Sequence, residues 1–111
     1  MEFYVKKTCE MTDQELHQLL DLFNKVFEKD RPMQVMLNQY TQNPFGFSYH
    51  SYFCDEGKIQ GAITCIPSYY VYKGERMIFA TIVDAMVAEE HRDLFGILRL
   101  LNNAYKELKN E

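Results

Sequence analysis

Asp84 is the residue whose position most suggests chemistry, because it is the only charged side chain in the apolar run from Met77 to Val87. A lone carboxylate in such a run can serve as a general base or as the group that binds an amine. The same residue can instead be a structural aspartate, hydrogen-bonded where its strand ends. The sequence leaves both interpretations open, and Asp84 is our candidate catalytic residue.

The histidines and cysteines are weaker candidates. His91 follows two glutamates, so a solvated imidazole is a simpler expectation than a catalytic base. His50 is expected to be a surface or half-buried residue of a strand. Cys65 is expected to be a buried, inert thiol, because no histidine lies beside it in the sequence to activate it. The three cysteines form no CxxC pair, which predicts no metal site and fits a reducing cytosol.

Composition limits the class of protein. A length of 111 residues predicts one domain over residues 1–111, and a hydrophobic share of 47% excludes a disordered chain. The net charge of −4 provides no basic surface for nucleic acid. The chain has no apolar run of roughly 18 residues and no signal-peptide pattern, so we expect a cytoplasmic protein without a membrane partner.

The elements that hold these residues follow from hydrophobic periodicity and turn-forming residues. Thr12 and Glu15 form a capping-box pattern that begins a helix, and Pro67 predicts a bulge or an unpaired position within its strand. The expected order is strand 2–7, helix 13–29, a short helix 32–42, strands 48–54, 59–72 and 76–87, and helix 94–108. This order predicts an α+β fold with a mostly antiparallel sheet and helices on both faces.

Two segments bear on function. Segment 30–47 is rich in Met, Phe and Tyr, and it can either wall an acceptor site or be a packing helix. The strand 76–87 is apolar on both faces, which is typical of a central strand that is covered on both sides. Simple alternation predicts one face with Met77, Phe79, Val83, Ala85 and Val87, and the other with Ile78, Ala80, Ile82 and Met86.

The run from Val83 to Arg92, Val-Asp-Ala-Met-Val-Ala-Glu-Glu-His-Arg, resembles the fourth strand of the GNAT N-acetyltransferase superfamily and the approach to its pyrophosphate loop. The Pro-containing strand that leads to Lys73-Gly74-Glu75 resembles the same family. Members typically continue Arg-Gly-x-Gly-x-Gly/Ala or, in one branch, Arg-Gly-Lys-Gly-Ile-Phe. Here Arg92 is followed by Asp-Leu-Phe-Gly, and the simplest alignment shortens the loop by two residues, one of them a Gly.

The resemblance covers the first two-thirds of a GNAT fold, so it implies a truncated GNAT-like architecture that lacks the final strands and helix. It implies acetyl-CoA as co-substrate, acetyl transfer to an amine and no metal. The residues that it maps to the cofactor path are Met86, Val87, Arg92, Leu94, Phe95 and Gly96. Asp93 is expected to cap the helix that follows it.

Whether the domain catalyses the reaction stays open at this point. The alternative is a non-catalytic dimerisation or binding module on the same scaffold. An exposed apolar edge on strand 76–87 would favour a homodimer that covers it. A third hypothesis is an unrelated α+β module that binds a small apolar ligand, which a strand order other than 1-2-3-4 would indicate.

Overall fold

The computed structural model describes residues 1–92 and 94–109, and its elements follow the predicted order. The strands are β1 (Glu2–Lys7), β2 (Tyr49–Asp55), β3 (Lys58–Tyr72) and β4 (Glu75–Val87). The helices are α1 (Asp13–Phe27), α2 (Met33–Thr41) and α3 (Leu94–Lys109), with short 3₁₀ turns at Thr8–Glu10 and Glu89–His91. The predicted α+β class is therefore confirmed.

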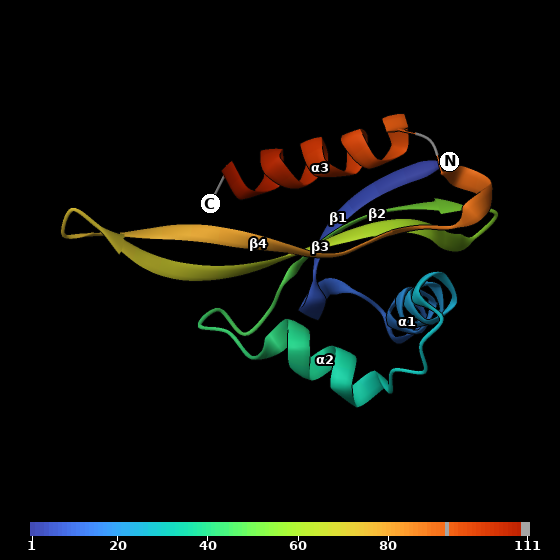
Figure 1. Cartoon of the computed structure of the whole chain (residues 1–111), viewed down its shortest axis with the longest axis horizontal. Coiled ribbons are helices and arrows are strands. Elements are labelled where there is room, and N and C mark those ends of the chain that lie inside the picture. Colours follow the sequence, from blue (N-terminus) through green and yellow to red (C-terminus); the bar gives the residue numbers. More distant parts are fainter. Residues whose placement is uncertain (93, 110–111) are drawn as a thin grey trace.

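The four strands form one antiparallel sheet in the order β1-β2-β3-β4. Helix α3 covers one face, and α1 and α2 cover the other (Figure 1). No strand among the described residues pairs with the outer edge of β4. The prediction that strand 76–87 is central and covered on both sides is therefore wrong, because β4 is an edge strand and its residues 75–79 are all exposed.

On the face of α1 and α2, the helices bury an apolar stripe against the sheet. Helix α1 begins as predicted, because the Glu15 N–H donates to Thr12 Oγ1 at 3.1 Å and the Thr12 N–H donates to Glu15 Oε1 at 2.9 Å. The buried core on this side comprises Met11, Leu19, Leu22, Met36, Tyr40, Tyr52, Ile59, Ala62, Met86 and Ala88.

Glu15 also connects α1 to the sheet. Its carboxylate accepts hydrogen bonds from the Tyr52 hydroxyl and from Lys6 Nζ at 3.0 Å. Burial alone would raise the pKa of Glu15, but the hydrogen bonds from the Thr12 backbone, Tyr52 and Lys6 outweigh it and lower the pKa from 4.5 to about 2. The charged Glu15 carboxylate therefore links helix α1 to strands β1 and β2.

On the other face, α3 packs Leu100 and Ala104 onto a second core. That core is formed by Tyr49, Phe53, Ile63, Cys65 and Val87. Gly61 has a specific role in it, since a Cβ at Gly61 would lie 2.1 Å from Cε1 of the Phe53 ring. Only a glycine lets the large buried ring lie across β3 at this point.

Strands β3 and β4 continue beyond the rest of the sheet. Pairing between β2 and β3 ends at Tyr49 and Cys65, whereas β3 and β4 stay paired as far as Tyr72 and Glu75. The result is a projecting two-stranded ribbon, which we call the arm and define as residues 66–80 (Figure 1). Of the two alternatives predicted for Pro67, the bulge is wrong, because Pro67 pairs in register with Ala80. The unpaired position is found on its other side, because β2 has already ended there.

The irregularity lies instead in β4. Ala62 pairs with Met86 and Thr64 pairs with Val83, so Asp84 and Ala85 together face the single residue Ile63. This is a β-bulge, and Asp84 takes a left-handed φ of 51° in it. The extra residue reverses the alternation. Val83 therefore shares the α1/α2 core with Met86, and Val87 packs under α3 with Ala80, which corrects the predicted faces.

Candidate functional site

The bulge places the Asp84 carboxylate against α2 and the linker between α1 and α2. The Tyr40 hydroxyl donates to Asp84 Oδ2 at 2.5 Å, and Arg31 Nη1 donates to the same oxygen at 3.3 Å. Arg31 Nη2 also donates to the Tyr40 hydroxyl oxygen at 3.2 Å, which closes a triangle of side chains. We call Arg31, Tyr40 and Asp84 the acid cluster.

Arg31 is held firmly in this cluster. Its Cζ lies 3.5 Å from the centroid of the Phe23 ring, and Nη1 donates to Gln39 Oε1 at 2.6 Å. The side chains of Arg31 and Asp84 are only 10% and 13% exposed, so the ion pair is largely removed from water. Arg31 Nε is buried and has no hydrogen-bond partner in the described part of the chain.

The surroundings of Tyr40 decide the charge state of its hydroxyl group. Burial, together with the hydrogen bond to Asp84, raises the pKa of Tyr40 well above its usual range, although Arg31 partly opposes the shift. Tyr40 is therefore a neutral hydrogen-bond donor. Both hydrogen bonds to the carboxylate reach Oδ2, and no hydrogen bond within the described residues reaches Oδ1. That second oxygen is available to a further donor, such as an amine.

His50 lies next to the cluster as a buried neighbour of Tyr40. The two ring centroids are 4.9 Å apart, and the His50 nitrogens lie 2.7 Å from Thr8 Oγ1 and 3.0 Å from Thr64 Oγ1. Burial lowers the pKa of His50 from 6.5 to about 3, so the ring is neutral. The prediction of a surface or half-buried residue is wrong, because β2 lies inside the sheet and α2 covers this position.

The residues mapped to the cofactor path lie along one stretch at the end of β4. Met86 and Val87 are buried, and Arg92 Nε donates to the Val87 carbonyl oxygen at 3.0 Å. The backbone then turns through Glu89–His91, and α3 begins with Leu94 and Phe95, followed by the half-buried Gly96. The predicted cap Asp93 lies outside the described residues.

The other candidates from the sequence lie apart from the acid cluster. His91 is partly buried, with Nε2 3.3 Å from Asp55 Oδ2 and its ring at the edge of Phe53. Cys65 is buried as predicted, and burial raises the pKa of its thiol, which makes it a poor nucleophile. His17 stays on the exposed side of α1 as a neighbour of the Asp13 carbonyl.

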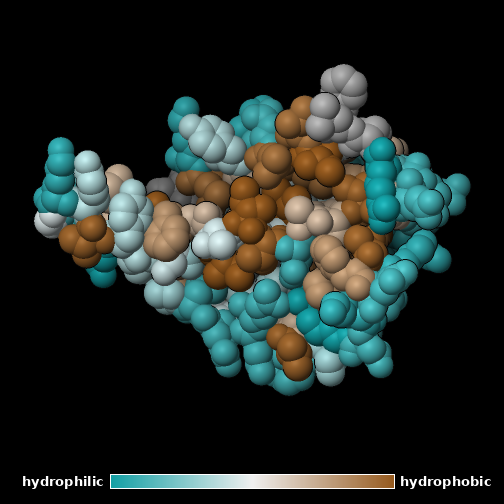
Figure 2. Space-filling view, in the orientation of Figure 1, coloured by the Kyte–Doolittle hydropathy of each residue, from teal (hydrophilic) through white to brown (hydrophobic). Residues whose placement is uncertain are grey.

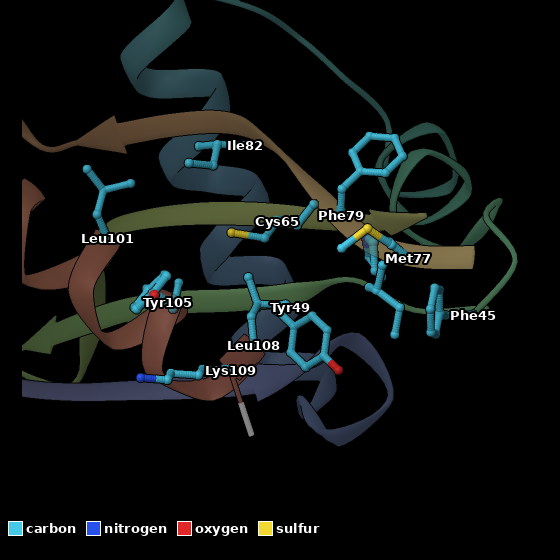
Figure 3. Close-up of a pocket in the computed structure, with 14 residues that line it drawn as sticks. Phe45, Tyr49, Cys65, Met77, Phe79, Ile82, Leu101, Tyr105, Leu108 and Lys109 are labelled. Atoms are coloured by element: carbon cyan, nitrogen blue, oxygen red, sulfur yellow. The ribbon is translucent and has the colours of Figure 1, made fainter. Parts of the chain in front are cut away.

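A sizeable cavity lies on the opposite side of the sheet from the acid cluster. It has a volume of about 870 Å³ and lies between α3 and the arm (Figure 3). Tyr49, Cys65 and Ile82 come from the strands beneath it, and Leu101 and Tyr105 come from α3. Its lining is mostly apolar and includes no carboxylate among the described residues.

Sequence reasoning missed Arg31 and Tyr40 as partners of Asp84. The sequence places both residues in segment 30–47, which can be an acceptor wall or a packing helix, and indicates no contact with Asp84. They are 53 and 44 residues from Asp84 along the chain, so no local pattern connects them. The one available signal was that an isolated charge in an apolar strand needs a partner.

The described residues contain neither a membrane-spanning helix nor a metal-binding cluster. None of their helices is both long and apolar enough to cross a membrane. Within the same part of the chain, no group of three or more His, Cys, Asp or Glu side chains is arranged to hold a metal ion.

No family model and no curated protein matches this sequence. Solved structures do resemble it. A conserved Enterococcus faecalis V583 protein, described as a probable N-acyltransferase, matches at 17% identity and a TM-score of 0.73, over 99% of this chain and 27% of its own. A Trypanosoma brucei acetyltransferase matches at 14% identity and a TM-score of 0.70, over 98% and 76%.

An aminoglycoside acetyltransferase from an uncultured soil sample matches at 20% identity and a TM-score of 0.63, over 97% of this chain and 72% of its own. The chain thus spans about a quarter of the first of these proteins and about three-quarters of the other two. At these identities the likeness establishes the fold. The chain has the fold of the GNAT acetyltransferases, with one four-stranded antiparallel sheet and, among the described residues, three α-helices.

Proposed function

We propose that this GNAT-like domain binds acyl-CoA along the outer edge of β4 and transfers its acetyl group to an amine. The observation that carries the proposal is the bulge at Asp84 and Ala85. It interrupts an edge strand at the point where the family resemblance puts the cofactor, and it brings a carboxylate to the same point. No strand among the described residues pairs with the outer edge of β4 at Ala85 and Met86, so an extended ligand can bind there as an added strand would.

The start of α3 supports a place for the pyrophosphate. The helix has 16 residues and begins shortly after β4 ends. Its first N–H groups and the positive end of its dipole favour an anion. Arg92 lies between the two elements, and its guanidinium, which already donates to the Val87 carbonyl, adds positive charge beside them.

We assign the acceptor to the α1/α2 side of the bulge, where Asp84 Oδ1 can bind the amine and accept its proton. The amine nitrogen attacks the thioester carbonyl carbon, the carbon–sulfur bond breaks, and the thiolate leaves as coenzyme A. Arg31 and Tyr40 both come from segment 30–47, and their hydrogen bonds to Asp84 favour the acceptor-wall interpretation of that segment.

A non-catalytic binding module is the second candidate, and one observation favours it. The Asp84 carboxylate is already paired with Arg31 and hydrogen-bonded to Tyr40, as a purely structural carboxylate would be. This candidate predicts a stable fold without affinity for acyl-CoA.

Calorimetric titration with acetyl-CoA separates the two candidates. We expect micromolar binding that weakens at least about tenfold, or by about 1.4 kcal/mol, in Arg92→Glu. Lys106→Glu is the matched control, because it makes the same charge change on the exposed surface of the last part of α3. We expect it to bind like the wild type. Absence of binding at millimolar ligand would favour the binding module.

Turnover is then measured as thiol release over a panel of primary amines. We expect Asp84→Asn to retain acetyl-CoA binding and to lose turnover, because the amide cannot accept the amine proton. An Asp84→Asn variant with full turnover would remove Asp84 from the chemistry.

A further inference from the structure

The arm and the neighbouring edge of β4 expose an unusual amount of apolar surface. The side chains concerned are Tyr69, Tyr70, Val71, Tyr72, Met77, Ile78, Phe79 and Ile82, which are 39–72% exposed. The arm has only two strands, and an isolated two-stranded ribbon is marginally stable in water. Figure 2, which views the β4 edge, shows hydrophobic side chains gathered between α3 and the α1/α2 layer.

The exposed apolar area, counted over both strands of the arm, approaches that of one side of a standard interface. With 150–250 Å² for an aromatic side chain and less for the aliphatic ones, the exposed parts amount to roughly 700 Å². The largest apolar patch on a typical monomer is about 300–600 Å², and one side of a standard protein interface buries about 800 Å². The arm therefore resembles one half of an interface more closely than a free surface.

We propose that a second copy of this chain covers this edge, with residues 76–82 of the two β4 strands paired antiparallel about a two-fold axis. A strand that pairs antiparallel with its own copy is self-complementary, which an isologous dimer requires. Within the paired segment 76–82 only Arg76, at its end, is charged, and the run from Met77 to Ile82 contains no charge and no proline to keep it from pairing. In this antiparallel pairing Arg76 of one copy faces Ile82 of the other, so no like charges are brought together.

The bulge determines where the pairing ends. A regular ladder cannot continue through Asp84 and Ala85, because two residues there replace one and the strand bends. The dimer contact therefore occupies the first part of the β4 edge and leaves Ala85–Val87 open. The inference is independent of acyl-CoA binding, and a chain without cofactor affinity would still form this dimer.

The cavity beside the arm fits the same arrangement. Its lining includes Met77, Ile78, Phe79 and Ile82 of β4, the strand with which the second copy would pair. Side chains of the added strand that point toward α3 would extend over this apolar space. Dimerisation would then reduce the exposure of the α3 residues Leu101 and Tyr105 as well.

The test is the mass of the whole chain in solution, measured by sedimentation and light scattering over a concentration series. We expect twice the monomer mass of 13.2 kDa at micromolar concentration. Ile78→Lys with Ile82→Lys should give a monomer, because two charges would be buried at the edge. Val35→Lys is the matched control: Val35 is 51% exposed on α2, away from the arm, and its variant should remain a dimer.

A wild-type monomer at about 100 μM, which is far above the dissociation constant of a standard interface, would overturn the proposal. So would a dimer that survives the double substitution, or open-ended association in place of a closed pair. Amide exchange on the wild type provides a second measurement that needs no variant. Amides of residues 76–82 should become more protected as the concentration rises, whereas concentration-independent exchange there would place the contact elsewhere.

Discussion

The ion pair between Arg31 and Asp84 gives the sharpest energetic prediction. The informative variants are Arg31→Met, which keeps the length of the side chain, and Asp84→Asn, which keeps its shape. Asn also tolerates the left-handed φ of 51° at this position, so the second variant changes the charge without adding backbone strain. Each variant leaves one member of a largely buried pair without its partner.

The expected loss follows from burial. The side chains of Arg31 and Asp84 are 10% and 13% exposed, and removing one partner of such a pair costs about 3–5 kcal/mol. Tyr40 still donates to Asp84 in Arg31→Met, so we expect a value near the lower limit, about 3 kcal/mol. At about 4 °C or more per kcal/mol, the melting temperature would fall by about 12 °C or more.

The assay is urea unfolding of the wild type, both single variants and the double variant. Because the two residues interact directly, the double variant should lose about 1–3 kcal/mol less than the sum of the single losses. Losses that add to within about 0.5 kcal/mol would refute the reasoning, since they would mean that the two charges do not stabilise each other in the folded protein.

Three further predictions concern the elements around the site. Glu15 has a pKa of about 2 in the folded chain, against an ordinary value of 4.5. Its stabilising effect is therefore complete above pH 4.5 and is lost as the pH falls toward 2. The urea midpoint of Glu15→Gln should vary less with pH between 4.5 and 2 than that of the wild type. His50 has a pKa of about 3 against 6.5, so stability should also fall as the pH drops from 6.5 to 3, and His50→Gln should flatten that slope while lowering stability at pH 7. Gly61→Ala should cost about 1–3 kcal/mol in urea unfolding, because its Cβ would lie 2.1 Å from the Phe53 ring. Phe53→Leu should reduce that cost, and an unchanged cost in this background would exclude the ring as its cause.

The sequence predicted best what local interactions determine. The capping box of Thr12 and Glu15 is decided by a few neighbouring residues, and it formed as expected. The order and class of the elements followed from hydrophobic periodicity, because a long apolar pattern has the period of either a helix or a strand and not of both. The GNAT-like fold followed from a motif at the end of β4 and is confirmed by the solved structures.

What depends on tertiary context was not predictable. The sequence predicts either a bulge or an unpaired position at Pro67; the proline is unpaired on the side where β2 has ended, and the bulge lies at Asp84 instead. The burial of His50 required knowing that helix α2 would cover β2. Arg31 reaches Asp84 only because the linker between two helices passes over the bulge, and no spacing in the sequence encodes that contact.

The central claim is that acyl-CoA lies along β4 after the bulge and at the start of α3. The most direct measurement is an amide chemical-shift titration of the whole chain with acetyl-CoA. The proposal predicts shifts concentrated at Ala85–Val87 and in the first turn of α3, with residues 76–82 little changed. Shifts confined to the residues around the 870 Å³ cavity, or none at millimolar ligand, would contradict it.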